Sequence, residues 1–252
     1  MIEIKPIPFE PAQPAATAEL RQLFEAVAPA IVSAHATLGP SVPGPSAPPE
    51  LVEAVREFLD GCEKLDAEYG ETGPLPLEDA DEFADTLLRY LAELRNWLPR
   101  LGLADREAVL DRILIGAALW AVRHDVELMP LDSLVNALAH AANNATSKQE
   151  LAAVFGLMQG VIGAVAEVVK ADLDKSDPYR PWRILLLNFA IVAVRSQDIP
   201  MMQHAFAALE RHLPEECPGF FAEGVARAKH PAFADEVRDL LNAEHVKWTV
   251  RH

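Results

Sequence analysis

The residues best suited to chemistry form one short cluster, Asp177-Pro178-Tyr179-Arg180-Pro181-Trp182-Arg183, which leads into an apolar stretch. Two guanidinium groups beside two aromatic rings at a helix start could clamp a carboxylate or a phosphate. Arginine offers paired donors, and the first turn of a helix offers free N–H groups. Further along the same stretch, polar residues are spaced to continue a strip on one helical face. The candidate ligand- or peptide-binding residues are therefore Tyr179, Arg180, Trp182, Arg183, Asn188 and Arg195.

A structural role is the other interpretation of this cluster. The two aromatic rings would pack on a neighbouring hairpin, and Arg180 and Arg183 would form ion pairs with acidic helices nearer the N-terminus. The charge distribution favours this alternative, since residues 1–175 hold 28 acidic and 13 basic side chains, whereas residues 176–252 hold 10 and 9. On this interpretation the arginines dock the two halves of the chain together.

No familiar catalytic or metal-binding motif accompanies the cluster. None of the eight histidines has another His or Cys three or four residues away, the spacing that places two metal ligands on one helical face. Cys62 and Cys217 lack a CxxC partner, and His124 near a helix end indicates a structural imidazole. We therefore expect no catalytic residue, no metal and no cofactor. An all-α enzyme or small-ligand-binding protein, with a pocket near Arg180 and Arg183 and the glycine-containing helix, is the alternative.

Helices must position these residues, because strand signals are sparse and apolar residues recur at helical spacing. From residue 105 onward the pattern becomes apolar on all sides, which predicts central helices. Four prolines are expected at helix starts, where a missing N–H does no harm: Pro130, Pro178, Pro214 and Pro231. The expected helices cover residues 17–38, 50–69, 78–97, a stretch from 105, 130–142, 147–173, 178–195, 199–213, 214–228 and 231–248.

The helix expected over 147–173 is apolar enough to raise a transmembrane alternative. Its capping sequence at 146–150 and Glu167 in its last turn favour a central helix of a soluble protein instead. The pair Gly156 and Gly160 would let a neighbouring helix approach closely. The sequence therefore predicts a buried helix that is tightly packed at Gly160.

A helical hairpin is used more than once in this chain. Arg112-Ile113-Leu114 is echoed by Arg183-Ile184-Leu185, and the last two hairpins match at an offset of 31, which pairs Pro200 with Pro231 and Phe189 with Phe220. Residues 183–214 resemble a degenerate tetratricopeptide-type unit, with small residues at Ala190 and Ala193 in the first helix and Pro214 closing the unit. The resemblance implies stacked antiparallel helix pairs with a concave groove for a peptide or protein partner.

The sequence thus predicts an all-α fold of about ten helices, mostly stacked antiparallel hairpins, with an irregular orthogonal bundle as the alternative. Residues 1–49 would form an arm, a first helix and a proline-rich linker. Residues 50–100 would form an acidic helical hairpin. Residues 101–252 would form the repeat-like region, packed with the rest as one domain.

Charge narrows the range of partners. The net charge is −16, and acidic residues outnumber basic ones by 14 to 3 between Glu50 and Glu93. Such a field repels nucleic acid and anionic lipid, whereas a basic protein segment is compatible with it. No signal peptide begins the sequence. We therefore expect a cytoplasmic, non-enzymatic interaction module of adaptor or assembly-factor type, with a protein or peptide partner and no membrane span; the sequence leaves its oligomeric state open.

Overall fold

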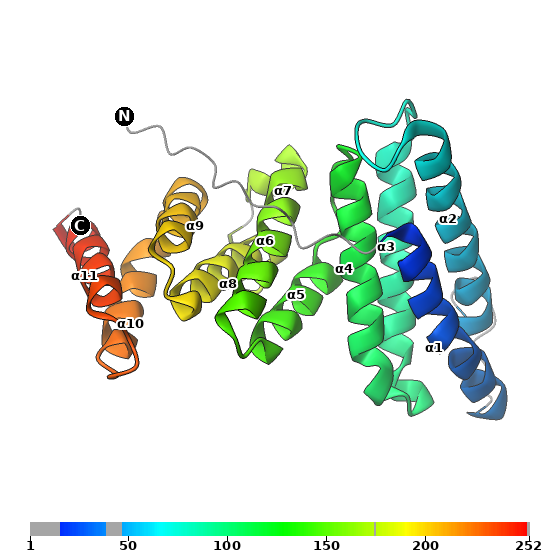
Figure 1. The fold of residues 1–252 in the computed structure, drawn as a ribbon, viewed down its shortest axis with the longest axis horizontal. Coiled ribbons are helices and arrows are strands. Elements are labelled where there is room, and N and C mark those ends of the chain that lie inside the picture. Colours follow the sequence, from blue (N-terminus) through cyan, green and yellow to red (C-terminus); the bar gives the residue numbers. More distant parts are fainter. Residues whose placement is uncertain (1–15, 39–46, 174, 251–252) are drawn as a thin grey trace.

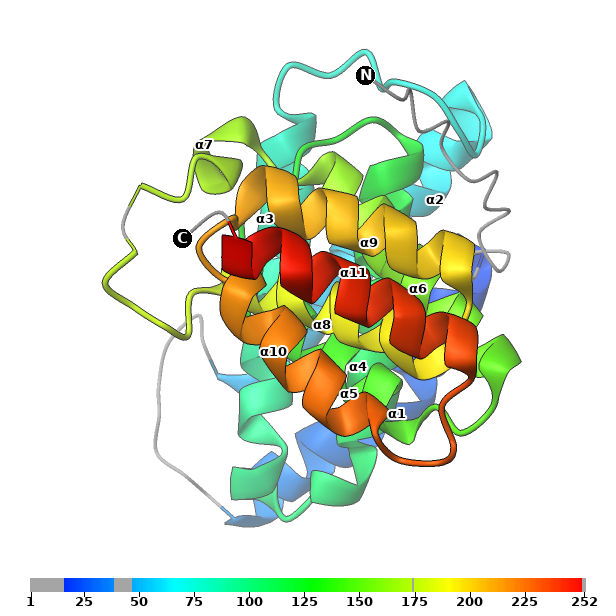
Figure 2. The ribbon, with the colours of Figure 1, turned by 90° about the vertical axis from the view of Figure 1, so that its left-hand side faces the viewer.

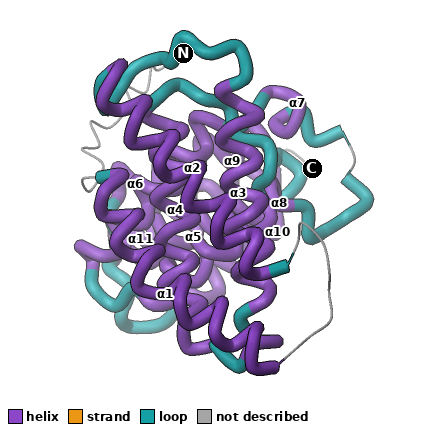
Figure 3. Tube along the Cα trace, turned by 90° about the vertical axis from the view of Figure 1, so that its right-hand side faces the viewer, coloured by secondary structure: helices purple, strands orange, loops and turns teal. Residues whose placement is uncertain are grey.

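The computed structural model describes residues 16–38, 47–173 and 175–250 and shows an all-α fold, as predicted (Figure 1). No strand occurs in these ranges (Figure 3). Most of the expected N-terminal arm and most of the proline-rich linker lie outside the described residues. Two 3-10 turns, Pro99–Leu101 and Ala104–Arg106, link the third and fourth helices. The α-helices are α1 (Thr17–Leu38), α2 (Pro48–Tyr69), α3 (Ala80–Trp97), α4 (Glu107–Arg123), α5 (Asp132–Asn144), α6 (Lys148–Ala164), α7 (Glu167–Lys170), α8 (Pro181–Ser196), α9 (Ile199–His212), α10 (Cys217–Ala228) and α11 (Asp235–Val250).

The helices follow one another along the long axis of the molecule (Figure 1). Helices α1 to α4 pack together at one end, α5, α6 and α8 occupy the middle, and α9 to α11 lie at the other end. Helices α10 and α11 form an antiparallel hairpin (Figure 2). One connected set of buried side chains extends from Leu20 on α1 to Trp248 on α11.

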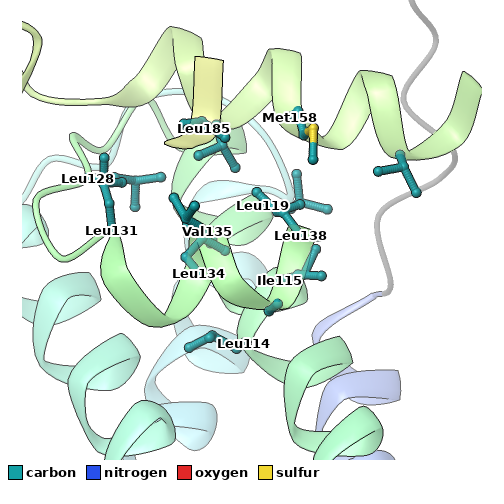
Figure 4. Close-up of a cluster of buried hydrophobic side chains, with 14 of the residues drawn as sticks. Leu114, Ile115, Leu119, Leu128, Leu131, Leu134, Val135, Leu138, Met158 and Leu185 are labelled. Atoms are coloured by element: carbon teal, nitrogen blue, oxygen red, sulfur yellow. The ribbon is translucent and has the colours of Figure 1, made fainter. Parts of the chain in front are cut away.

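Helix α4 is the central element, as its all-round apolar sequence predicts. Helices α1, α3, α5 and α6 all pack against it. On one side, Leu114, Ile115 and Leu119 meet α5, together with Met158 of α6 and Leu185 of α8 (Figure 4). Its buried residues are Leu110, Asp111, Ile113, Leu114, Ile115, Gly116, Ala117, Ala118, Leu119, Trp120 and Ala121.

The prediction of one long helix over 147–173 is wrong, because α6 ends at Ala164. An isolated parallel bridge between Leu128 and Val165 ends it: Leu128 N donates to the carbonyl of Ala164 at 2.8 Å, and Ala166 N donates to the carbonyl of Leu128 at 3.0 Å. The predicted capping sequence is confirmed, since Ser147 and the side chain of Glu150 satisfy one another's backbone N–H groups. In the described part of the chain, no helix combines the length and apolar character needed to cross a bilayer.

The four prolines expected at helix starts lie two to four residues before their helices. Prolines do stand in the first two helical positions elsewhere, at Pro48, Pro181, Pro200 and Pro218.

The spacing between the last two hairpins also differs from the prediction. Helices α8 and α10 begin 36 residues apart, as do α9 and α11, so the sequence match at 31 does not align the helices.

Close packing occurs at Gly116 rather than at Gly160. A Cβ at Gly116 would lie 2.2 Å from Leu20 Cδ2, whereas one at Gly160 would make ordinary contacts with Val122 and Leu119 at 3.7 and 3.8 Å. At Gly163 a Cβ would meet nothing within 4 Å. Gly116 therefore allows close approach of α4 to α1.

We predict that Gly116→Ala lowers the free energy of unfolding by about 1–3 kcal/mol, because the new methyl group overpacks the contact with Leu20. The matched change Gly163→Ala, also in a helix, should raise stability by about 0.5–1 kcal/mol, since alanine loses less backbone entropy on folding. Urea unfolding of both variants tests this. Equal effects of the two changes would contradict close packing at Gly116.

Candidate functional site

The Asp177–Arg183 cluster lies at the start of α8, and both of its arginines are paired. Arg183 donates to both oxygens of Glu216, from Nε to Oε1 at 2.5 Å and from Nη2 to Oε2 at 2.8 Å. Arg180 Nε donates to Asp172 Oδ1 at 2.6 Å, and its Nη2 lies 3.7 Å from Glu215 Oε1. The predicted pairing with acidic N-terminal helices is wrong, because these carboxylates come from the turn after α7 and the turn before α10.

The two aromatic residues of the cluster behave differently. Tyr179 is exposed, whereas Trp182 is only 2% exposed. The Trp182 ring meets the ring of His212 edge to face, with centroids 5.3 Å apart. Packing of Trp182 on a neighbouring helix, part of the structural alternative, is therefore present.

The predicted polar strip along α8 does not form one surface. Arg195 donates from Nη1 to the carbonyl of Ala142 at 2.6 Å and from Nη2 to the carbonyl of Ala145 at 2.9 Å. These carbonyls belong to the C-terminal end of α5, where a cation also stabilises the helix dipole. Asn188 lies in the middle of α8 and is partly buried. Arg195 therefore joins α8 to α5 and lies apart from Arg180.

A cavity of about 370 Å³ opens beside Arg180 and Trp182. We call it the α7–α8 hollow. Helix α7 projects from one side of the stack (Figure 2). Val168, Val169, Asp172 and Leu173 form one wall of the hollow. The predicted alternative of a pocket near the arginines thus has a physical counterpart, although Arg183 does not line it. The lining residues are Met129, Leu131, Asp132, Val168, Val169, Asp172, Leu173, Arg180, Pro181 and Trp182.

Two lining residues carry buried polar atoms without a hydrogen-bond partner in the described structure, Asp172 Oδ2 and Trp182 Nε1. The Asp172 side chain is 6% exposed, and its other oxygen is held by Arg180. Its backbone is left-handed, with φ of 45°, a conformation that Asp and Asn adopt more readily than most residues. Because buried polar groups are nearly always paired, an unpaired acceptor and an unpaired donor on residues that line one cavity make this hollow a candidate site.

The rim of the hollow is apolar and exposed. Met129, Val168 and Leu173 are 52%, 68% and 88% exposed, respectively, and all three line the cavity. They come from the loop before α5, from α7 and from the loop after it. Three large apolar side chains are thus left exposed around a hollow whose lining is both polar and apolar.

A larger hollow of about 590 Å³ lies between α4 and α6, along Gly156, Gly160 and Gly163. It also contains polar atoms without partners among the described residues, Arg123 Nε and Gln159 Oε1. Both of these side chains are only partly buried. Asp172 belongs to the same partly buried class, whereas Trp182 is buried, so the α7–α8 hollow differs from this one by its fully buried donor residue.

The remaining titratable groups mostly hold the fold together. His124 contacts Asp66 Oδ1 through Nε2 at 2.9 Å and the Gly73 carbonyl through Nδ1 at 3.0 Å, which gives it the structural role predicted. Both cysteines are buried, and burial raises the pKa of Cys217 to about 12. No group of three or more His, Cys, Asp or Glu residues in the described ranges is placed to hold a metal ion.

The sequence identified Arg180 and Trp182 but missed Asp172, Met129, Val168 and Leu173. Asp172 was expected inside the last turn of a long helix, where nothing distinguishes it from a solvated carboxylate. The sequence makes no prediction for Met129, whereas Val168 and Leu173 lie in the same predicted helix, which is expected to be buried. Only the end of α6 at Ala164, which the sequence does not signal, brings them to the hollow.

Comparisons of the chain with protein-family models, with curated proteins and with solved structures find no match. The resemblance of residues 183–214 to a tetratricopeptide-type unit therefore stays a prediction.

We predict that Arg183→Ala lowers the free energy of unfolding by about 1–2 kcal/mol, because it leaves the partly buried Glu216 without its paired donors. The control is Arg227→Ala, which removes an exposed i,i+4 pair with Glu223 and should change stability by less than about 0.5 kcal/mol. Denaturant unfolding of the two variants gives the comparison. Equal stability would show that the Arg183 pair contributes little.

A second prediction concerns pH. Burial, helped by the charge of Arg211, lowers the pKa of His204 and of His212, where Lys170 adds to the effect. The unfolded chain therefore takes up protons that the folded chain resists, so stability present above pH about 6.5 should be lost as the pH falls below it. Melting temperatures between pH 7.5 and 5 should fall less for the double variant His204→Gln, His212→Gln. Parallel curves would refute the assignment to these histidines.

Proposed function

We propose that the chain is a non-enzymatic protein-interaction module, of adaptor or assembly-factor type, that binds a polypeptide partner at the α7–α8 hollow. The observation that carries this proposal is the exposed apolar rim formed by Met129, Val168 and Leu173. Exposed apolar side chains that gather at one place mark docking surfaces. Covering them releases roughly 25 cal/mol per Å² of buried apolar area.

The pairing of the arginines supports binding of protein surface over capture of a free anion. Arg183 is occupied by Glu216, and Arg180 by Asp172. An incoming phosphate or carboxylate would have to displace a carboxylate that already lies at hydrogen-bonding distance. The hollow therefore offers apolar contact and two polar atoms, rather than an unpaired cationic clamp.

The charge around the hollow supports a partner with basic residues. Near the start of α3, Asp81 accepts a hydrogen bond from the backbone N–H of Glu127, and Asp85 accepts one from that of Met129. Acidic residues therefore border the loop that carries Met129, one of the three rim residues. Burial raises the pKa of Asp85, although the Met129 N–H opposes this. The wider acidic stretch between Glu50 and Glu93 acts in the same direction.

We also propose a cytoplasmic location for this module and a groove similar to that of tetratricopeptide repeats. Two buried cysteines without a disulfide fit a reducing compartment. A small-ligand-binding protein, or an all-α enzyme built on the same hollow, is the second candidate. The unpartnered Asp172 Oδ2 and Trp182 Nε1 are the observation that favours it.

We predict that the double change Val168→Asp, Leu173→Asp reduces recovery of the native partner at least tenfold in affinity purification from the native cell. Two charges on the rim would have to be desolvated on binding. The matched control is Val246→Asp, Val250→Asp, which places the same two charges at exposed apolar positions on α11. Both variants should keep wild-type helical content. Unchanged recovery with the rim variant would refute the proposed docking surface.

A further inference from the structure

We infer that the α7–α8 hollow recognises a primary carboxamide, the side chain of a glutamine or asparagine in the partner. This inference rests on the proposed function and names the group that the hollow accepts. It follows from the two buried polar atoms without partners, one acceptor and one donor, on residues that line the same cavity.

The hydrogen-bonding inventory favours a neutral group that carries both a donor and an acceptor, and the carboxamide is such a group. Asp172 Oδ2 needs a donor, and the indole N–H of Trp182 needs an acceptor. A carboxamide supplies both an N–H and a C=O. An ammonium group supplies donors only, and a carboxylate supplies acceptors only and would face Asp172. Of these three groups, the carboxamide alone satisfies both atoms.

Asp172 is prepared to act as the acceptor. Arg180 Nε holds Oδ1 at 2.6 Å, whereas the buried Oδ2 has no hydrogen-bond partner in the described structure. The Asp172 N–H is bonded to the carbonyl of Val169 at 3.2 Å, which ties the residue to α7. The guanidinium also pairs with the Asp172 carboxylate, which reduces its attraction for a cationic ligand, and Asp132 is the other carboxylate of the lining.

Trp182 is equally fixed as the donor. It occupies the second position of α8, and its ring packs against His212. Burial and the neighbouring cations lower the pKa of His212, so this ring is predominantly neutral near pH 7. An indole held in one place donates in one direction, which suits recognition of a planar group.

The size and walls of the hollow suit a side chain of this kind. A cavity of about 370 Å³ accommodates one side chain and part of the backbone that carries it. The methylene groups of glutamine would contact Val168 and Leu173 while its amide reaches Asp172. The rim therefore contributes apolar contact, and the interior contributes selectivity.

The test is a titration followed by NMR of the indole N–H signals of ¹⁵N-labelled full-length protein. The chain has four tryptophans, and the signal lost in Trp182→Phe identifies Trp182. The probes are the Nα-acetyl methylamides of glutamine, glutamate, lysine and norleucine. We expect the glutamine probe to shift the Trp182 signal with an affinity at least tenfold above that of each other probe. Equal or stronger binding of the norleucine or lysine probe, or no binding of the glutamine probe, overturns the inference.

The variant Asp172→Asn sharpens the test. Asparagine tolerates the left-handed backbone and can still accept from Arg180, but it presents an NH₂ group in place of Oδ2. Glutamine binding should weaken at least tenfold, whereas Asp177→Asn, which removes a nearby exposed charge, should leave it unchanged. Unchanged binding in Asp172→Asn overturns the inference, and the probe series on the wild type decides the matter if that variant fails to fold.

Failure of the inference is distinguishable from failure of the proposed function. If the rim variant keeps its partner while the glutamine probe still binds in an Asp172-dependent way, the docking proposal fails and the carboxamide site stands. If the rim variant loses its partner but the glutamine probe does not bind, the docking surface stands and the inference is overturned.

Discussion

Helix α4 has almost no polar face, and the arrangement of the other helices follows from the need to cover it. Helices α1, α3, α5 and α6 each bury one side of it. Its one buried charge, Asp111, is compensated by Arg95 of α3 and by His140 of α5 at 2.9 Å. Because α5 and α6 must both return to α4, the loop at 124–131 and the end of α6 are brought together. The hollow forms next to this meeting point.

The bridge between Leu128 and Val165 ends α6 at this point. Once Ala166 donates to Leu128, α6 cannot continue, and the chain makes only the single turn of α7 before it reaches Asp172. A continuous helix would have placed Val168 elsewhere relative to α5. The exposure of the rim is therefore a consequence of an interrupted helix, and the same interruption places Asp172 beside Arg180 and Trp182.

Sequence periodicity located most helices well, because one-sided apolar spacing is a local property. Helix α1 has the predicted limits, and α2 and α3 end where predicted. The end of α6 was missed because Val165 and Ala166 are compatible with a helix, and a tertiary hydrogen bond to Leu128 decides their conformation. Residue type found Arg180 and Trp182, but no local signal shows that Glu216, 33 residues away, would pair with Arg183.

The pairing pattern separates two electrostatic roles. Arginines in the N-terminal part pair between α1 and α2, Arg21 with Glu63 and Arg56 with Glu25. Acidic side chains outnumber basic ones there, so most of the acidic excess stays uncompensated. That excess acts over about a Debye length and favours the approach of a basic partner in a salt-dependent way. The interior of the hollow, where Arg180 balances Asp172, selects by hydrogen bonding at short range. Under the proposed function, salt should therefore slow association of the partner far more than it weakens recognition of the carboxamide.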